Sequence, residues 1–216
     1  MDLTNNSKLN ALEYDAGVTI IGYNVESNKN EQDVAALKAL IAEQRERGAT
    51  VSEDIGNSDE YWWNDGRLMS INWSEKNLSG DLDISGVTSL TGLNCSKNQL
   101  SSLDVRNNTS LCRLHCDDNQ LSNLDVSNNT SLTSLWCAGN QLTCLDVSNN
   151  TLLESLECSE NQLSSLDVSK NTLLSQLMCS ENQLTSLDLT NNTEMEYLYC
   201  DSDVTVTGHD PRVVSN

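Results

Sequence analysis

The stretch "TSLTSLWCAGNQLTCLDVSNN", residues 130–150, is one complete unit of a pattern that recurs along the chain every 21 residues. Three apolar positions, Leu132, Leu135 and Cys137, and one polar position, Asn140, define the unit. Similarity of a chain to itself at a short fixed period is the signature of a repeat architecture, in which neighbouring units stack and bury a shared core. The period therefore determines the fold class before any single residue is interpreted.

The step of 21 residues links equivalent positions over most of the chain. The cysteine column contains Cys95, Cys116, Cys137, Cys158, Cys179 and Cys200. The asparagine column contains Asn98, Asn119, Asn140, Asn161 and Asn182, and Asp203 takes its last position. A degenerate first unit, "GRLMSINWSEKNLSGDLDISG", places Ile71 and Trp73 in the leucine and cysteine columns.

These columns give the pattern L-x-x-L-x-C-x-x-N-x-L followed by x-x-L-D-V-S-x-N. The pattern resembles the leucine-rich repeat over residues 66–200, and most of all the short 21-residue bacterial subclass (IRREKO-like) with cysteine in the third apolar position. The resemblance extends to internalin-like surface proteins. It implies a mainly β, right-handed solenoid with parallel sheets on two faces.

Side-chain alternation supports the same architecture without the resemblance. In "LxC" and "LDV", successive side chains point to opposite faces of an extended segment. Leu135, Cys137 and Leu145 therefore turn inward, while Trp136 and Asp146 turn outward. Because one coil cannot bury its own apolar row, stacked coils bury it together.

The cysteine column is predicted to be a row of buried free thiols. In-register strands lie about 4.8 Å apart, and side chains that point in parallel directions miss the Cβ separation of about 3.5–4.5 Å that a disulfide needs. A straight column also cannot place four sulfur atoms around a zinc ion. Disulfide pairing and metal binding are the alternatives. Cys112 and Cys144 lie outside the column, and we expect Cys144 to be partly exposed.

The asparagine column is predicted to be structural, since the resemblance implies that these side chains turn inward and bond to the backbone of neighbouring turns. An aspartate column stands on the outside of the opposite face: Asp83, Asp104, Asp125, Asp146, Asp167 and Asp188. Stacked like charges repel, so we expect each carboxylate to accept hydrogen bonds within the turn that follows it. Calcium bridging along the column is the alternative; otherwise no cofactor is expected.

Outward positions of the front strands vary from unit to unit, whereas those of the opposite face are monotonous. Variation suits a surface that is released from structural demands, and exposed aromatic residues in one band are candidates for binding. Neutral surface drift is the alternative. The predicted partner-binding residues are Arg113, His115, Asp117, Trp136, Glu157, Gln176, Met178, Tyr197 and Tyr199.

The chain has a net charge of -20, which argues against binding to nucleic acid. It contains no run of about 18 apolar residues, so membrane insertion is not expected. His115 beside Cys116 does not form a nucleophilic pair, because alternation turns one outward and the other inward. No other catalytic pattern is present, and the chain is predicted not to be an enzyme.

Residues 25–65 are predicted to form an N-terminal cap. It contains a helix over residues 30–47, with Asn30 or Asp33 at its start, and the beginning of a hairpin that turns at Asp65-Gly66. The helix, with Trp62, Trp63 and Trp73, is expected to close the open end of the solenoid. Residues 201–216 are predicted to form the C-terminal cap, with "VTVTG" as its closing strand.

Residues 1–24 align with residues 187–210, so they read as the tail of a preceding repeat array. The favoured interpretation is a piece of a longer protein with tandem modules. A closing strand that docks on another molecule is the alternative, and it would associate otherwise monomeric chains end to end. The stretch "MDLTNNSKLN" has neither a basic region nor an apolar core, so it does not resemble a secretory signal.

Together these features predict a non-enzymatic protein-binding or adhesion module of a multi-repeat bacterial cell-surface protein that binds through its variable front sheet. A spacer without a ligand and a glycan-binding module are the alternatives. The extracellular or surface location follows from the resemblance alone.

Overall fold

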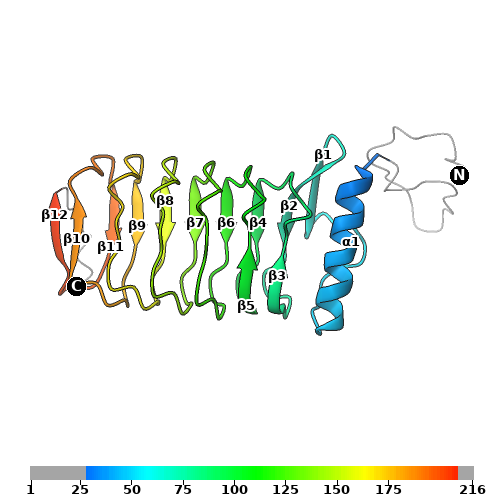
Figure 1. Ribbon diagram of the computed structural model, residues 1–216, viewed down its shortest axis with the longest axis horizontal. Helices are drawn as coiled ribbons and strands as arrows, with labels where there is room; N and C mark the ends of the chain where they lie inside the picture. The colour runs from blue at the N-terminus through cyan, green and yellow to red at the C-terminus, as the bar shows by residue number, and fades with distance from the viewer. Residues whose placement is uncertain (1–27, 209–216) are drawn as a thin grey trace, which may run out of the picture.

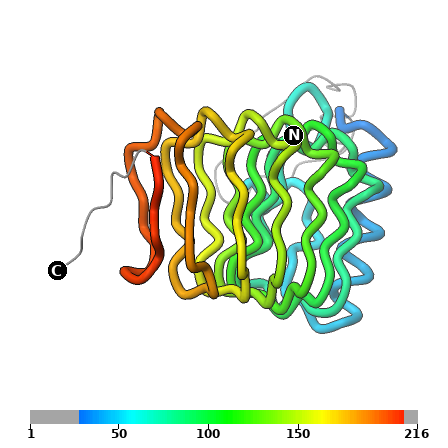
Figure 2. The backbone as a smooth tube through the Cα atoms, turned by 60° about the vertical axis from the view of Figure 1, so that its left-hand side comes forward, coloured from blue at the N-terminus to red at the C-terminus, as the bar shows by residue number. Residues whose placement is uncertain are grey.

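The computed structural model describes residues 28–208, which form an elongated stack of coils with one helix at its N-terminal end (Figure 1). The mainly β solenoid predicted from the 21-residue period is confirmed. Figure 2 shows the coils as successive windings of similar shape. The tail at residues 1–24, and the part of the predicted C-terminal cap beyond Gly208, lie outside the described residues.

The front of the solenoid is an eight-stranded sheet with the order β1-β2-β4-β6-β7-β8-β9-β11. Strand β1 (Tyr61–Asn64) pairs antiparallel with β2 (Arg67–Asn72), and all later neighbours are parallel. The remaining strands are β4 (Gly92–Asn94), β6 (Arg113–His115), β7 (Ser134–Trp136), β8 (Ser155–Glu157), β9 (Gln176–Met178) and β11 (Tyr197–Tyr199). Leu114 pairs with Leu135, and Leu135 with Leu156. This register turns each sequence column into a row of side chains in space.

The back face also carries parallel strands, as the resemblance implies, but they occur only near its two ends. Strand β3 (Ser79–Asp83) pairs with β5 (Gln99–Asp104), and β10 (Ser186–Leu189) pairs with β12 (Thr205–Gly208). In the coils between, one backbone bond links neighbours, as from Gln141 N–H to the Leu121 carbonyl at 2.8 Å. The next amide, that of Leu142, donates instead to an asparagine side chain, Asn161 Oδ1, at 3.0 Å. The backbone bonds are therefore too sparse for a ladder.

Helix α1 (Glu31–Glu46) covers the N-terminal end of the stack (Figure 1). The Asn30 side chain accepts a hydrogen bond from the Asp33 N–H at 3.1 Å, which makes Asn30 the N-cap. Asp33 does not cap the helix, although the sequence allowed it to. Its buried carboxylate accepts bonds from Arg67 Nε at 2.7 Å and from the Leu68 N–H at 3.0 Å. Asp33 thus fastens the helix to β2.

The hairpin that begins the front sheet turns at Asp65 and Gly66, whose φ angles are 46° and 79°. Both angles are positive, as a two-residue type I′ turn requires. Trp73 is fully buried in the cysteine column and meets the edge of Tyr61 at a ring-centroid distance of 6.3 Å. The expectation that Trp62 helps to close the core is wrong. Its side chain alternates to the outer face of β1 and is 54% exposed.

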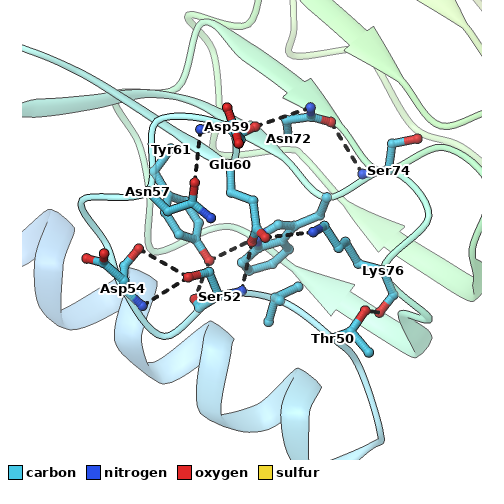
Figure 3. A network of polar contacts seen from close by, with 12 residues as sticks. Thr50, Ser52, Asp54, Asn57, Asp59, Glu60, Tyr61, Asn72, Ser74 and Lys76 are labelled. Carbon is cyan, nitrogen blue, oxygen red and sulfur yellow. Dashed lines mark hydrogen bonds and ion pairs between the residues drawn. The ribbon is translucent and has the colours of Figure 1, made fainter.

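A polar network joins the segment after α1 to the first coil (Figure 3). The Glu60 carboxylate, only 5% exposed, pairs with Lys76 Nζ at 2.7 Å and accepts the Ser52 N–H at 2.8 Å. The Tyr61 hydroxyl donates to the Ser52 carbonyl at 2.7 Å and accepts from Trp73 Nε1 at 3.2 Å. The network satisfies polar groups beside the apolar end of the stack, which buried groups require.

Candidate functional surface

The cysteine column lies inside the solenoid. Cys95, Cys116, Cys137, Cys158 and Cys179 are fully buried, Cys200 at the C-terminal end is half-buried, and all eight cysteines are free. Burial raises the pKa of the Cys95 thiol to about 12, so this sulfur is neutral at physiological pH. Cys112 is half-buried and Cys144 is exposed. In this arrangement the column acts as an apolar row of the core.

The predicted asparagine column bonds one coil to the next. Asn140 Nδ2 donates to the carbonyl of Cys116 in the preceding coil at 3.0 Å and to that of Cys137 at 3.1 Å. Its Oδ1 accepts the Leu121 N–H at 3.0 Å. The side chain therefore supplies hydrogen bonds that the turn backbone cannot make by itself.

A second asparagine ladder escaped the interpretation of the sequence. Its members, Asn108, Asn129, Asn150, Asn171 and Asn192, are 0% exposed. Asn150 Nδ2 donates to the Val126 carbonyl at 3.0 Å and to the Asn129 carbonyl at 2.9 Å, both in the preceding coil. The signal is present in the sequence, because these five asparagines keep the 21-residue period.

The aspartates of the back face accept hydrogen bonds from the turn that follows each of them. The Asp125 carboxylate accepts the Ser127 hydroxyl at 2.7 Å and the Ser127 N–H at 3.1 Å. These bonds hold the pKa of Asp125 below its ordinary range. Among residues 28–208, no group of three or more His, Cys, Asp or Glu side chains is arranged to hold a metal ion. Calcium bridging along the column stays a prediction.

The front sheet presents two rows of outward side chains. One row contains His115, Trp136, Glu157, Met178 and Tyr199, and the neighbouring row contains Arg113, Ser134, Ser155, Gln176 and Tyr197. We call these two rows, with Asp117, the front band. It contains all nine residues that the sequence predicts to bind a partner. Arg113 and Gln176 are exposed, whereas His115, Asp117, Glu157 and Met178 are half-buried.

Aromatic side chains stand exposed on the front band. Trp136 and Tyr197 are each 39% exposed and Tyr199 is 43% exposed. The imidazole of His115 stacks on the indole of Trp136, with ring centroids 4.2 Å apart and planes only 8° from parallel. Burial lowers the pKa of His115, and the nearby Asp117 partly offsets that effect. The stack follows from the strand register but was not predicted.

Beside these rings the surface is hollowed and acidic. This acidic depression is lined by Asp117, Asp118, Ala138, Glu157, Ser159, Glu160, Met178, Ser180, Glu181, Tyr197 and Tyr199. Burial raises the pKa of Asp117 and of Glu157, although both accept hydrogen bonds. Asp117 accepts the Ser96 hydroxyl at 3.0 Å, and Glu157 accepts the Ser159 N–H at 3.0 Å.

The rim of the acidic depression is built on left-handed backbone. Asp118, Glu160 and Glu181 have φ angles of 52°, 53° and 53°, and Gly139 in the same column has 59°. Residues with a Cβ adopt this region at a cost, so the charged side chains occupy positions that glycine would fill more easily. Gly139 was the one sequence signal for this column.

The geometry offers no nucleophile at His115 and Cys116. Cys116 is fully buried while His115 lies on the outer face of β6, and burial raises the Cys116 pKa well above its ordinary value. Within residues 28–208, no helix is both long and apolar enough to cross a bilayer.

Comparison with known proteins agrees with this architecture. The functional domain of InlJ from Listeria monocytogenes, described as including a cysteine ladder, is 36% identical over 66% of this chain, with a TM-score of 0.55. The internalin InlF from L. monocytogenes strain 4b F2365 matches 94% of the chain at 20% identity, with a TM-score of 0.60. The leucine-rich repeat domain of APL1B matches 63% at 22% identity, with a TM-score of 0.54.

The aligned part amounts to 36% of the InlJ domain, 64% of the InlF structure and 44% of the APL1B domain. No protein-family model matches the sequence, and no curated protein is similar to it. The similarity to InlJ agrees with three features of this chain, which are the 21-residue period, the buried column of thiols and the solenoid fold. The chain is a leucine-rich repeat solenoid with a buried cysteine column, and in this architecture it is similar to the internalins InlJ and InlF.

Proposed function

We propose that this chain is a non-enzymatic module that binds a protein partner through its front band, within a recognition or adhesion protein of a bacterial surface. The observation that carries the proposal is the group of exposed rings, Trp136, Tyr197 and Tyr199, on one face of the front sheet. No element among residues 28–208 packs over that face, which is free in Figure 1.

Aromatic side chains contribute most to interfaces, because they bury a large area at a small loss of conformational freedom. The back face of the same coils provides a comparison within the molecule, because serine, asparagine and aspartate recur there. A demand of the solenoid itself would recur in every coil, whereas the residues of the front band differ from coil to coil. Arg113, His115 and Gln176 would surround the rings as polar contacts.

The surface location and the absence of catalysis are parts of the same proposal. They are supported by the similarity to internalins and by the resemblance of the sequence to surface leucine-rich repeat proteins. A strongly acidic chain also suits a protein that must stay soluble and avoid nucleic acid.

Selection from a displayed library of protein fragments tests the proposal. The clones that bind the chain are measured again with the triple variant Trp136→Ala/Tyr197→Ala/Tyr199→Ala. The matched control is Leu152→Ala/Leu173→Ala, which removes exposed apolar side chains, 46% and 45% accessible, from turns outside the front band. We expect affinity to fall by about tenfold or more in the triple variant and to hold in the control.

Three outcomes contradict the proposal. If no clone is enriched, the spacer interpretation is favoured, and if the clones bind both variants as they bind the unaltered chain, the binding surface lies outside the front band. If only oligosaccharides on a glycan array bind, and the triple variant loses them, the front band is a carbohydrate surface instead.

A further inference from the structure

The acids of the depression form none of the ion pairs that exposed acids elsewhere in the described residues form, although the charge of Lys97 acts on Asp118. Glu75 pairs with Lys97 at 2.9 Å, Asp104 with Arg106 at 2.7 Å and Glu53 with Arg45 at 3.0 Å. None of the acids that line the depression forms an ion pair within residues 28–208, and no lysine or arginine lines it. The acids in question are Asp117, Asp118, Glu157, Glu160 and Glu181.

This arrangement is unfavourable in the free protein. Asp117 and Glu157 are half-buried, and the charges of Asp117 and Glu160 both act against ionisation of Glu157. Carboxylates that are withdrawn from water and lie near each other are stabilised by an added cation. The same field repels nucleic acid and other anions, so charge complementarity restricts the occupant to a positively charged group.

Apolar side chains in the depression narrow the choice further. Met178, Tyr197 and Tyr199 line part of it. A lysine or arginine side chain has an apolar stem that can lie on these residues and a cation that can face the acids or a ring. A bare metal ion would make no apolar contact with these three side chains.

The spacing of the strands indicates the conformation of the partner. Strands β7, β8, β9 and β11 are consecutive and in register, so Trp136 and Tyr199 are separated by three strand steps, or about 14 Å. An extended peptide rises about 3.3 Å per residue, and about four residues therefore connect the two rings. We propose that the front band binds an extended basic segment of a partner protein, with a lysine or arginine in the acidic depression and an apolar side chain on Trp136.

This inference rests on the proposed function and specifies its partner. The test uses the full chain and fluorescein-labelled Leu-Ser-Ala-Ser-Lys, at about 0.15 M salt, where attraction to net charge is largely screened. Two counterpart peptides carry norleucine, which keeps the stem without the charge, or glutamate in place of lysine. We expect a dissociation constant below about 1 mM for the lysine peptide, at least about fivefold weaker binding of the norleucine peptide, and no binding of the glutamate peptide.

Matched variants separate local recognition from the general acidity of the chain. Glu157→Gln/Glu160→Gln removes two charges from the depression, and Asp146→Asn/Asp167→Asn removes two from the back face while keeping the oxygens that accept turn hydrogen bonds. We expect the front variant to weaken binding by at least about fivefold and the back variant by less than about twofold. Thermal melts verify that both variants remain folded.

The proposal is overturned if both variants lose affinity equally, if norleucine replaces lysine without loss, or if no lysine peptide binds. Failure of this proposal can be distinguished from failure of the proposed function. Library clones that depend on Trp136, Tyr197 and Tyr199 but contain no lysine or arginine would support protein binding and would refute this choice of partner.

Discussion

The front band and the back face belong to the same coils, at the same spacing, but they hold their carboxylates in opposite surroundings. On the back face, hydrogen bonds from the following turn lower the pKa of Asp104, Asp125, Asp146, Asp167 and Asp188. On the front band, burial raises the pKa of Asp117 and Glu157.

The difference shows that carboxylates have two roles in this molecule, one on each face. A back-face aspartate is satisfied by its own turn, so the same solution works in every coil and repeats with the period. The acids of the front band, Asp117 and Glu157, do not recur in every coil, and both are half-buried without an ion pair. Repetition therefore marks the residues that stabilise the solenoid, and irregularity marks the residues that are available for a partner.

The comparison assumes that the front and back faces belong to one stack of coils that the interior asparagines hold together. Replacing one of these asparagines is the strongest test of this assumption. Asn150→Ala removes two donors to carbonyls of the preceding coil, from a side chain that is 0% exposed. We expect the free energy of unfolding to fall by about 2–3 kcal/mol, measured by urea denaturation with circular dichroism. Its exposed neighbour Asn149, with one bond of 3.2 Å, is the control; Asn149→Ala should cost less than about 1 kcal/mol. Equal losses would mean that the second ladder is not a structural column.

The thiols distinguish interior from surface with a smaller effect. Cys137→Ser places a hydroxyl in a fully buried position, and we expect a loss of about 1–3 kcal/mol, whereas the exposed Cys144→Ser should change little. In a thiol titration of the native protein, Cys144 should react first, and the five fully buried thiols of the column should react only on unfolding. Fast reaction of the Cys137 thiol in the native protein would contradict its burial.

The two faces should respond to pH with opposite signs. The folded pKa of Glu157 is raised, so its carboxylate costs stability once the pH exceeds the ordinary value of 4.5. Glu157→Gln should therefore raise the free energy of unfolding at neutral pH, by less than about 1 kcal/mol, and the gain should vanish in acid. The folded pKa of Asp125 is lowered, so its charge stabilises the fold above the ordinary value of 3.8 and this contribution is lost as the pH falls through the folded pKa.

Asp125→Asn should accordingly lower stability at neutral pH and have no effect in strong acid. Urea titrations of both variants between neutral and acid pH provide the measurement. If both variants changed the free energy of unfolding in the same direction at neutral pH, the contrast between the two faces would be contradicted.

The smallest expected effect concerns the ring stack on the front band. His115→Ala should cost about 0.5–1 kcal/mol, the contribution typical of a stacked aromatic pair. Because burial lowers the pKa of His115, the fluorescence of Trp136 should titrate with a midpoint below the ordinary 6.5 in the native protein. The difference between the native and His115→Ala titrations isolates this signal from the other tryptophans. A midpoint above 6.5 would show that His115 is not held in a half-buried stack.

The columns of apolar residues could be predicted from the sequence, whereas the second asparagine ladder, which keeps the same period, was not. The leucine and cysteine columns followed from spacing and alternation, because in-register coils convert sequence period directly into position. The length of the back strands did not follow, since the Asn161 side chain competes for the Leu142 amide that a ladder would use. The position of Asp33 depends on Arg67, which is far along the chain.

The asparagines of both ladders donate toward the coil that precedes them, as Asn140 and Asn150 show. A gene duplication of 21 residues would therefore add a coil that brings its own donors and meets the acceptors it needs, whereas an insertion of another length would misalign every bond downstream. Each copy would lengthen the molecule by about 4.8 Å and add one more set of exposed positions open to later mutation.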